Sequence, residues 1–172
     1  MGVQDHSESA DREIGPARCF ILTVSDTRKP ETDESGTAAA GLLSEAGHIV
    51  AERWIVPNDR AAISDAARAA VAAGADLVLT LGGTGVSRRD VTVEALRGLV
   101  DKDLPGFGEM FRALSAKEFG AAAILSRATL GATSDGRLIA ATPGSPAAVR
   151  LALREILVPQ LKHLLREVRK QA

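Results

Sequence analysis

Near its middle, the sequence contains the run Asp76-Leu77-Val78-Leu79-Thr80-Leu81-Gly82-Gly83-Thr84-Gly85. The first half of this run is almost continuously apolar, which is typical of a parallel β-strand buried on both faces of a sheet. The second half is a glycine loop, and glycine lets the backbone bend and approach a ligand without an intervening side chain. Ligands of open α/β sheets bind beyond the carboxyl ends of the strands, where this loop falls. The run therefore predicts a strand and a binding loop.

Strand and helix patterns alternate ahead of this run. Short apolar segments at 18–24 and 49–56 predict two further buried strands. Helices are predicted at about 36–46 and 60–73, where apolar residues recur at helical spacing and a glycine follows. The order strand, helix, strand, helix, strand implies parallel strands joined by right-handed crossovers, with helices on both faces of the sheet.

Beyond the glycine loop the pattern is less regular. Asp135-Gly136 lies between two apolar runs and predicts a β-hairpin of strands 129–133 and 137–142. The last helix carries a long apolar stripe that Pro159 should kink or restart. Helices or helical turns are also predicted at about 93–100, from 104 through 114, and within 117–127.

The chain is interpreted as one folded domain after a short tail. Residues 18–172 are expected to form a three-layer α/β sandwich with a mostly parallel central sheet, helices on both faces and a small β-hairpin. Residues 1–17 are polar and are expected to be a disordered N-terminal tail. A chain of 172 residues can support a full core, and with only 3% aromatic residues that core must be aliphatic.

Composition excludes several classes of protein. The 21 basic and 22 acidic side chains nearly cancel, which argues against a nucleic-acid binder that relies on bulk charge. The single cysteine, Cys19, rules out an internal disulfide and lies in an apolar run, where we expect it to be buried. The apolar stretches fall short of the roughly 20 residues that span a bilayer. We therefore expect no membrane contact and a cytoplasmic location.

The residue types present favour phosphate chemistry. The three histidines are far apart in sequence, and we expect packing or surface roles for them. The sequence contains neither a Cys/His spacing for structural zinc nor a Gly-x-Ser-x-Gly nucleophile elbow. Carboxylates, hydroxyls, arginines and backbone amides remain, and these suit phosphate handling with a metal ion better than covalent acyl chemistry.

The glycine loop, residues 82–85, predicts an anion cradle, because free amides and the start of the next helix attract negative charge. Thr84 is expected to add a hydroxyl donor. The loop is not a P-loop, since no lysine follows it, and it is not a dinucleotide fingerprint, since Arg88 replaces the third glycine. A second loop, 143–146, also joins a strand to a helix and could add amides. Taken alone, either loop could be a turn without a ligand.

Charged residues beside the glycine loop strengthen the ligand interpretation. Arg88 and Arg89 could neutralise phosphates, although exposed arginines are common. Asp90 should meet Asn58 and Asp59 at one rim, because parallel strands place their carboxyl ends together. An acidic group beside a phosphate cradle is a natural magnesium ligand, although Asp90 could instead cap a helix.

These motifs together resemble the Mog/MoaB family of molybdenum cofactor synthesis. The similarity covers about residues 20 to 161. Its most specific pieces are Ser25-Asp26-Thr27-Arg28 with Ser35-Gly36, Gly82-Gly83-Thr84-Gly85 with Arg89-Asp90-Val91-Thr92 and Glu94-Ala95, Pro105-Gly106-Phe107-Gly108-Glu109 with Phe111-Arg112, Leu125-Ser126-Arg127, and Pro143-Gly144-Ser145-Pro146. Five such pieces in the right order make chance an implausible explanation.

The resemblance implies a molybdopterin-binding α/β fold that assembles as a homo-trimer or, in MoaB-like members, a homo-hexamer. Active members transfer AMP from Mg·ATP to the terminal phosphate of molybdopterin, releasing pyrophosphate. This implies Mg²⁺ as cofactor, ATP and molybdopterin as substrates, and a molybdenum insertase as partner. The catalytic candidates are Asp90, Asp59 and Asn58, of which Asp90 and Asp59 are also the metal candidates. The implied substrate-binding residues are Ser25, Asp26, Gly82, Gly83, Thr84, Gly85, Arg89, Ser126, Arg127, Pro143, Gly144 and Ser145.

One residue departs from the family pattern. The second catalytic aspartate of the family directly follows the proline that ends the second strand, whereas this chain has Asn58 after Pro57, with Asp59 one residue later. An amide cannot contribute negative charge to a metal. Either Asp59 takes over through a small loop shift, or activity is reduced, or the chain is a non-catalytic molybdopterin carrier or scaffold. A third alternative is an unrelated anion-binding domain for nucleotides or sugar phosphates.

Overall fold

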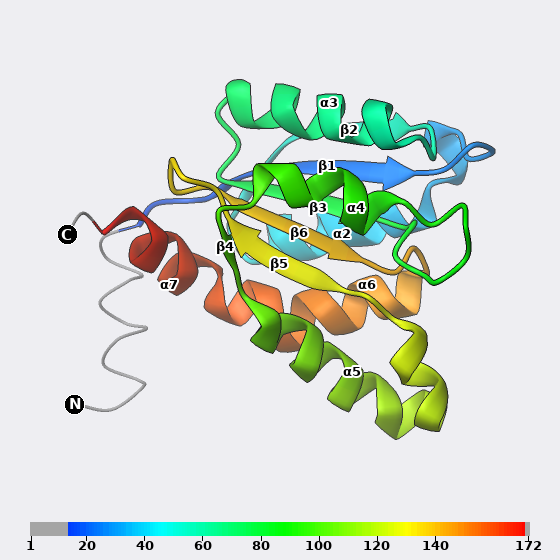
Figure 1. The fold of residues 1–172 in the computed structure, drawn as a ribbon. Helices are drawn as coiled ribbons and strands as arrows, with labels where there is room; N and C mark the ends of the chain where they lie inside the picture. The colour runs from blue at the N-terminus through cyan, green and yellow to red at the C-terminus, as the bar shows by residue number, and fades with distance from the viewer. Residues whose placement is uncertain (1–13, 171–172) are drawn as a thin grey trace.

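The computed structural model describes residues 14–170, and a six-stranded sheet runs through their centre (Figure 1). The strands are β1 (Arg18–Val24), β2 (Ile49–Val56), β3 (Leu77–Leu81), β4 (Lys102–Asp103), β5 (Thr129–Ala132) and β6 (Leu138–Thr142). The helices are α2 (Glu34–Glu45), α3 (Arg60–Ala72), α4 (Thr92–Leu96), α5 (Pro105–Phe119), α6 (Pro146–Ala152) and α7 (Val158–Arg169). Short 3-10 turns occupy Pro30–Thr32, Arg97–Leu99 and Gly120–Leu125, and a π turn occupies Leu153–Leu157.

The strand order is β2-β1-β3-β6-β5-β4. The first four of these strands are parallel, and β5 and β4 are antiparallel to their neighbours. From the central pair, the chain moves outward from β1 to β2 in one direction and from β3 towards β6 in the other. The β1/β3 pair is therefore the point at which the strand order reverses, and the loops that follow these two strands flank the crevice where ligands of such sheets bind.

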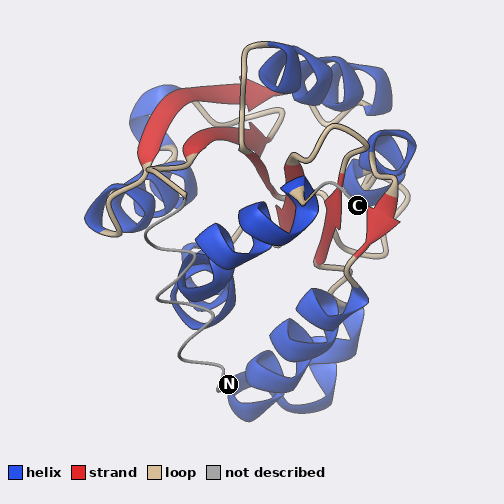
Figure 2. Ribbon diagram, turned by 90° about the vertical axis from the view of Figure 1, so that its left-hand side faces the viewer, coloured by secondary structure: helices blue, strands red, loops and turns tan. Residues whose placement is uncertain are grey.

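Helices lie on both sides of the sheet (Figures 1 and 2), and a hydrophobic core fills the space on each of its faces. Helices α3 and α4 cover one face, and α2, α5, α6 and α7 cover the other. Neighbouring residues of β1 serve opposite cores, Ile21 with α2 and Leu22 with α3, because side chains alternate along a strand. This explains the unbroken apolar run in β1 and confirms the expected sandwich. Within residues 14–170, every helix is too short or too polar to cross a bilayer.

The clearest differences from the sequence prediction are at α2, α5 and β4. Helix α5 runs to Phe119, beyond the predicted end at residue 114. Helix α2 begins two residues early, at Glu34, because the carboxylate of Asp33 accepts the Gly36 N–H and caps it. Strand β4 was not predicted: it has two residues, both exposed, and pairs with β5 without any apolar alternation to mark it. The hairpin of β5 and β6 is confirmed as an antiparallel pair.

The structure also shows how the predicted domain begins and ends. The last helix is interrupted by the π turn Leu153–Leu157 just before Pro159, which has no N–H to continue a regular helical ladder. Of the tail expected at 1–17, residues 1–13 lie outside the described part of the chain. Ala17, at its end, is buried in the core, and its carbonyl accepts the N–H of Ile49.

Cys19 is fully buried in β1, and burial, with a smaller contribution from Asp76, raises the pKa of its thiol to about 12. Ellman's reagent cannot reach the buried thiol, and the raised pKa keeps the thiol in the unreactive protonated form near neutral pH. We therefore expect Ellman's reagent to modify the native protein at least about a hundredfold more slowly than the unfolded chain. The measurement is the absorbance time course with and without guanidinium chloride. Prompt reaction of one equivalent in the native protein would contradict this burial.

Candidate functional site

Four loops gather at the carboxyl edge of the parallel strands. They follow β1 at residues 25–29, β2 at 57–59, β3 at 82–90 and β6 at 143–145. The register of β1, β2, β3 and β6 brings their last residues level with one another. Every residue that the sequence singled out for binding or catalysis, apart from Ser126 and Arg127, lies on one of these loops.

Glycines allow the loops after β3 and β6 to touch each other and the end of β1. Gly82 and Gly83 have φ angles of +100° and +65°, a conformation that other residues rarely adopt. A Cβ atom on Gly82 would lie 3.0 Å from the carbonyl oxygen of Val24, and one on Gly83 would overlap the hydroxyl of Thr92. A Cβ atom on Gly144 would lie 3.1 Å from the Cα of Gly82. The end of β1 and the loops after β3 and β6 can therefore pack this closely only with glycine at these positions.

Arg127 holds the carbonyl groups of the glycine loop. Its Nε donates to the oxygens of Gly85 at 2.8 Å and Thr84 at 3.3 Å, and its Nη2 donates to that of Asp90 at 3.0 Å. Glu94 on α4 accepts from both Nη atoms of Arg127. A trans peptide directs C=O and the next N–H to opposite sides, so the amides after Thr84 and Gly85 point away from Arg127. Arg127 thus orients the cradle and commits its own donors to the protein.

Asp90 lies against the glycine loop. Its Oδ2 accepts the N–H of Ser87 at 2.9 Å, and a Cβ atom on Gly85 would lie 2.7 Å from the same oxygen. The N-cap of α4 is Val91, with no side-chain cap, so Asp90 does not have the capping role that was its alternative. Its carboxylate closes the turn at the end of the loop and remains half-buried beside the cradle.

Asn58 and Asp59 have different roles. Asp59 is the N-cap of α3, and its carboxylate accepts the N–H of Ala62 at 2.9 Å. Asn58 turns towards the glycine loop, where its Oδ1 would lie 3.2 Å from a Cβ atom on Gly83. This oxygen is buried without a hydrogen-bond partner among the described residues. A buried unpaired acceptor is costly, so the Asn58 oxygen is a candidate ligand contact.

Asp26 connects the loops after β1, β2 and β3. Its Oδ1 accepts the N–H of Asn58 at 2.9 Å, and its Oδ2 accepts from Nη2 of Arg89 at 3.1 Å. The Arg89 side chain is 81% exposed, so this ion pair contributes little stability and leaves the arginine accessible to an anion. Ser25 bonds within its own loop, where its Oγ accepts the N–H of Arg28 at 3.0 Å.

The remaining predicted site residues are mostly occupied by the protein itself. Thr84 is only 2% exposed, so the hydroxyl expected to reach a ligand does not face solvent. The Oγ of Ser126 accepts the backbone N–H two residues on at 3.3 Å. Ser145 caps α6 by accepting the N–H three residues on at 3.2 Å, and Pro143 is half-buried at the start of the same loop. These loops therefore offer backbone amides more than side chains.

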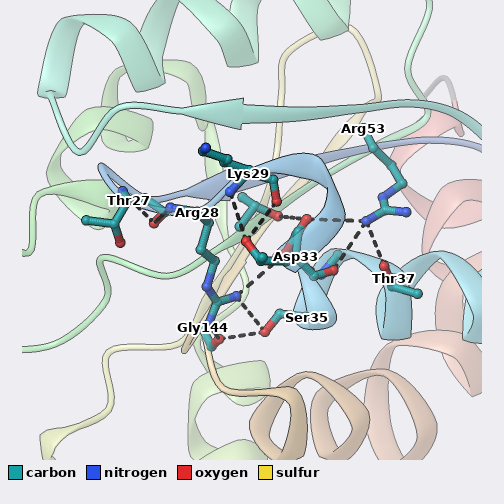
Figure 3. A network of polar contacts seen from close by, with 12 residues as sticks. Thr27, Arg28, Lys29, Asp33, Ser35, Thr37, Arg53 and Gly144 are labelled. Carbon is teal, nitrogen blue, oxygen red and sulfur yellow. Dashed lines mark hydrogen bonds and ion pairs between the residues drawn. The ribbon is translucent and has the colours of Figure 1, made fainter.

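Sequence reasoning missed a polar network centred on Asp33 (Figure 3). Asp33 is 4% exposed and accepts hydrogen bonds from Thr23 Oγ1 at 2.9 Å, the Gly36 N–H at 2.9 Å and Arg53 Nη2 at 3.3 Å. Arg28 Nη1 lies 3.6 Å from its Oδ1. The sequence held one signal for it: an aspartate three residues ahead of Gly36 has the spacing of an N-cap.

No group of three or more His, Cys, Asp or Glu side chains within residues 14–170 is placed to hold a metal ion. Next to the glycine loop lie the side-chain oxygens of Asp90, Asn58 and Thr92, and the carboxylate of Asp26 accepts the backbone N–H of Asn58. Of the two expected metal ligands, the structure brings Asp90 to the loop and commits Asp59 to α3.

These features define a doubly wound α/β domain with a glycine loop at the point where its strand order reverses. The chain matches the family described as "Probable molybdopterin binding domain" over residues 20–163, and it belongs to that family. Molybdenum cofactor biosynthesis protein B of Bacillus subtilis (strain 168) is 46% identical over 99% of both chains. The resemblance to the Mog/MoaB family is thereby confirmed.

Solved structures share the fold. One described as molybdenum cofactor biosynthesis protein B has a TM-score of 0.87 and 45% identity, covering 91% of this chain and 98% of its own. Another, the tungsten cofactor synthesizing protein MoaB from Pyrococcus furiosus, has a TM-score of 0.82 and 38% identity, covering 90% of this chain and 98% of its own.

Replacing Gly83 should test the packing of the loop. Gly83→Ala combines a positive φ with an overlap on Thr92, so we expect it to lower the free energy of unfolding by about 1–3 kcal/mol. Gly98→Ala is the matched control, because Gly98 has open space around its Cβ position, and it should change stability by about 0.5 kcal/mol or less. Urea unfolding measures both, and equal effects would contradict this role for Gly83.

The pair Glu94–Arg127 should make stability depend on pH. The hydrogen bond from Arg127 lowers the pKa of Glu94 in the folded protein. A lowered pKa gives a contribution that is present above the pKa of the unfolded chain and lost as the pH falls through the folded value. Glu94→Gln should therefore be less stable than the wild type at neutral pH, by at most about 1 kcal/mol because the pair is one-third exposed. This difference in the free energy of unfolding should shrink in acid. Glu118→Gln, on the exposed face of α5, controls for general charge effects in the same urea titrations.

Proposed function

We propose that this protein binds molybdopterin at the carboxyl edge of β1 and β3 and acts in molybdenum or tungsten cofactor synthesis. Membership of the molybdopterin-binding family and relatives named for molybdenum cofactor biosynthesis support the proposal. One observation carries it in this chain: Arg127 ties the carbonyls of Thr84 and Gly85. The amides that follow are thereby turned away from the arginine, as an anion cradle for a phosphate group requires.

The reaction that we propose is adenylyl transfer. An oxygen of the terminal phosphate of molybdopterin attacks the α-phosphorus of ATP. The bond from this phosphorus to the oxygen that bridges to the β-phosphate breaks, and pyrophosphate leaves with the bonding electrons. A phosphate is already ionised and nucleophilic near neutral pH, so no histidine base is required. The task left to the protein is to position two anions together, which preorganised backbone amides do without reorganising.

Magnesium fits this edge of the sheet as an ion held mainly by substrate phosphates. Mg²⁺ commonly binds one or two protein carboxylates and takes its other ligands from phosphates and water. Asp90 and the buried Oδ1 of Asn58 are the groups that would hold it, whereas Asp59 is committed to capping α3. When bound, the ion would offset the charge repulsion between the two phosphate groups.

A non-catalytic molybdopterin carrier or scaffold is the second candidate, and Asn58 favours it. The amide occupies the place beside Gly83, and the neighbouring carboxylate of Asp59 points into the first turn of α3. At the two positions where the family pattern has aspartates, this chain has the carboxylate of Asp90 and the amide of Asn58. Assembly into a trimer or hexamer and transfer to a molybdenum insertase stay predictions from the resemblance, and a cytoplasmic location stays a prediction from the composition.

Pyrophosphate release from molybdopterin and Mg·ATP tests the two candidates. We expect turnover by the wild type, a gain of about tenfold or more in kcat for Asn58→Asp, and loss of turnover with retained molybdopterin binding for Asp90→Asn. Asp101→Asn, an exposed carboxylate away from these loops, is the control for charge.

The outcomes separate the alternatives. Molybdopterin binding without pyrophosphate release in wild type and Asn58→Asp would reject the transferase and favour the carrier. Failure of molybdopterin to bind, with binding of nucleotides or sugar phosphates instead, would reject both and favour an unrelated anion-binding domain.

A further inference from the structure

The loop after β6 is held by donors that the proposed reaction does not use (Figure 3). Ser35 Oγ donates to the carbonyl oxygen of Gly144 at 2.7 Å, and Arg28 Nη2 donates to the same oxygen at 3.3 Å. Arg28 Nη1 also donates to Ser35 Oγ at 3.0 Å, which joins the two donors to each other. The Gly144 carbonyl therefore accepts hydrogen bonds from the loop after β1 and from the first turn of α2.

Asp33 holds both donors in place. As the N-cap of α2, it fixes the helical turn that carries Ser35, and its Oδ1 lies 3.6 Å from Arg28 Nη1. Its Oδ2 accepts the hydroxyl of Thr23 in β1 at 2.9 Å. Charge-assisted hydrogen bonds of a buried carboxylate are strong and directional. Asp33 therefore connects the donors that bind the Gly144 carbonyl with the end of β1.

A second arginine on Asp33 offers a comparison within the same chain. Arg53 of β2 donates from Nη2 to Asp33 Oδ2 at 3.3 Å and to Thr37 Oγ1 at 3.0 Å. Figure 3 shows Arg28 and Arg53 on opposite sides of Asp33, with Gly144 beside Arg28. The two arginine side chains are similarly exposed, at 33% and 34%. They share a carboxylate and differ in whether they reach the loop after β6.

We propose that Asp33, Arg28 and Ser35 are positioning residues that set the loop after β6 for phosphate binding. Tying the Gly144 carbonyl fixes the opposite direction of the next N–H, that of Ser145, because the peptide is trans. The Ser145 N–H is thereby offered to a phosphate bound between this loop and the glycine loop. This inference rests on the proposed function for the identity of the ligand.

The contact between Gly82 and Gly144 supports this arrangement. The two glycines are close enough that a Cβ atom on either would meet the other's Cα within 4 Å, so the two loops share one ligand-facing surface. The glycine loop has its carbonyls tied by Arg127, and the loop after β6 has its carbonyl tied by Arg28 and Ser35. A preformed set of amides does not lose conformational freedom when the ligand arrives, which favours tighter binding.

Arg28→Met and Arg53→Met, compared side by side in the full-length protein, test the proposal. The first readout is backbone hydrogen–deuterium exchange in residues 143–148 of the ligand-free protein, and the second is molybdopterin affinity from a fluorescence titration. Arg28→Met should speed exchange in this segment several-fold and weaken molybdopterin binding about tenfold. Arg53→Met should leave both within about twofold.

A double-mutant cycle adds a test of the path through Asp33. Asp33→Asn should weaken affinity on its own but add little in the Arg28→Met background, because both changes release the same carbonyl. If Asp33→Asn does not fold, Ser35→Ala, which keeps the cap of α2, takes its place in the cycle and tests the second donor to the Gly144 carbonyl.

Each contrary result has a definite meaning. Equal effects of the two arginine variants would overturn the proposal. Weaker binding by Arg28→Met with unchanged exchange would also overturn it, since Arg28 would then contact the ligand itself. If wild type does not bind molybdopterin, the proposed function fails, while the exchange comparison in ligand-free protein still decides whether Arg28 positions the loop.

Discussion

The contact between Gly82 and Gly144 is the constraint on which this site depends. It lets two loops from adjacent parallel strands, β3 and β6, meet at van der Waals distance at the edge where the sheet reverses its strand order. Any side chain there would separate the loops and the amides that they carry. The sheet supplies the alignment, since the parallel register brings the two strands to the same level.

Arginines in this site serve the backbone more than the ligand. Arg127 binds three carbonyls after β3, and Arg28 binds one after β6. Each is balanced by a carboxylate, Glu94 for Arg127 and Asp33 for Arg28. Binding carbonyls with fixed cations turns the following amides the other way, so positive charge acts on the ligand indirectly, through oriented dipoles. A count of arginines near the loop would therefore overstate how many of them meet an anion.

Sequence patterns located the three strands β1, β2 and β3 and the glycine loop because these depend on local apolar runs and on glycine. They missed β4, whose two exposed residues are a strand only through pairing with β5. They also could not divide roles between Asn58 and Asp59, since adjacent residues differ only in which way the loop turns them. The hydrogen bonds from Arg28 and Ser35 to the Gly144 carbonyl join residues more than a hundred positions apart, and only the fold brings them together.

The split of roles at the start of α3 has an evolutionary consequence. Asn and Asp are nearly equivalent as N-caps. Exchanging the residue types of Asn58 and Asp59 would therefore keep the chain's composition, net charge and helix, yet place a carboxylate beside the cradle. The two positions can therefore change separately in evolution: residue 58 alters the groups beside the glycine loop, while the cap of α3 depends on residue 59.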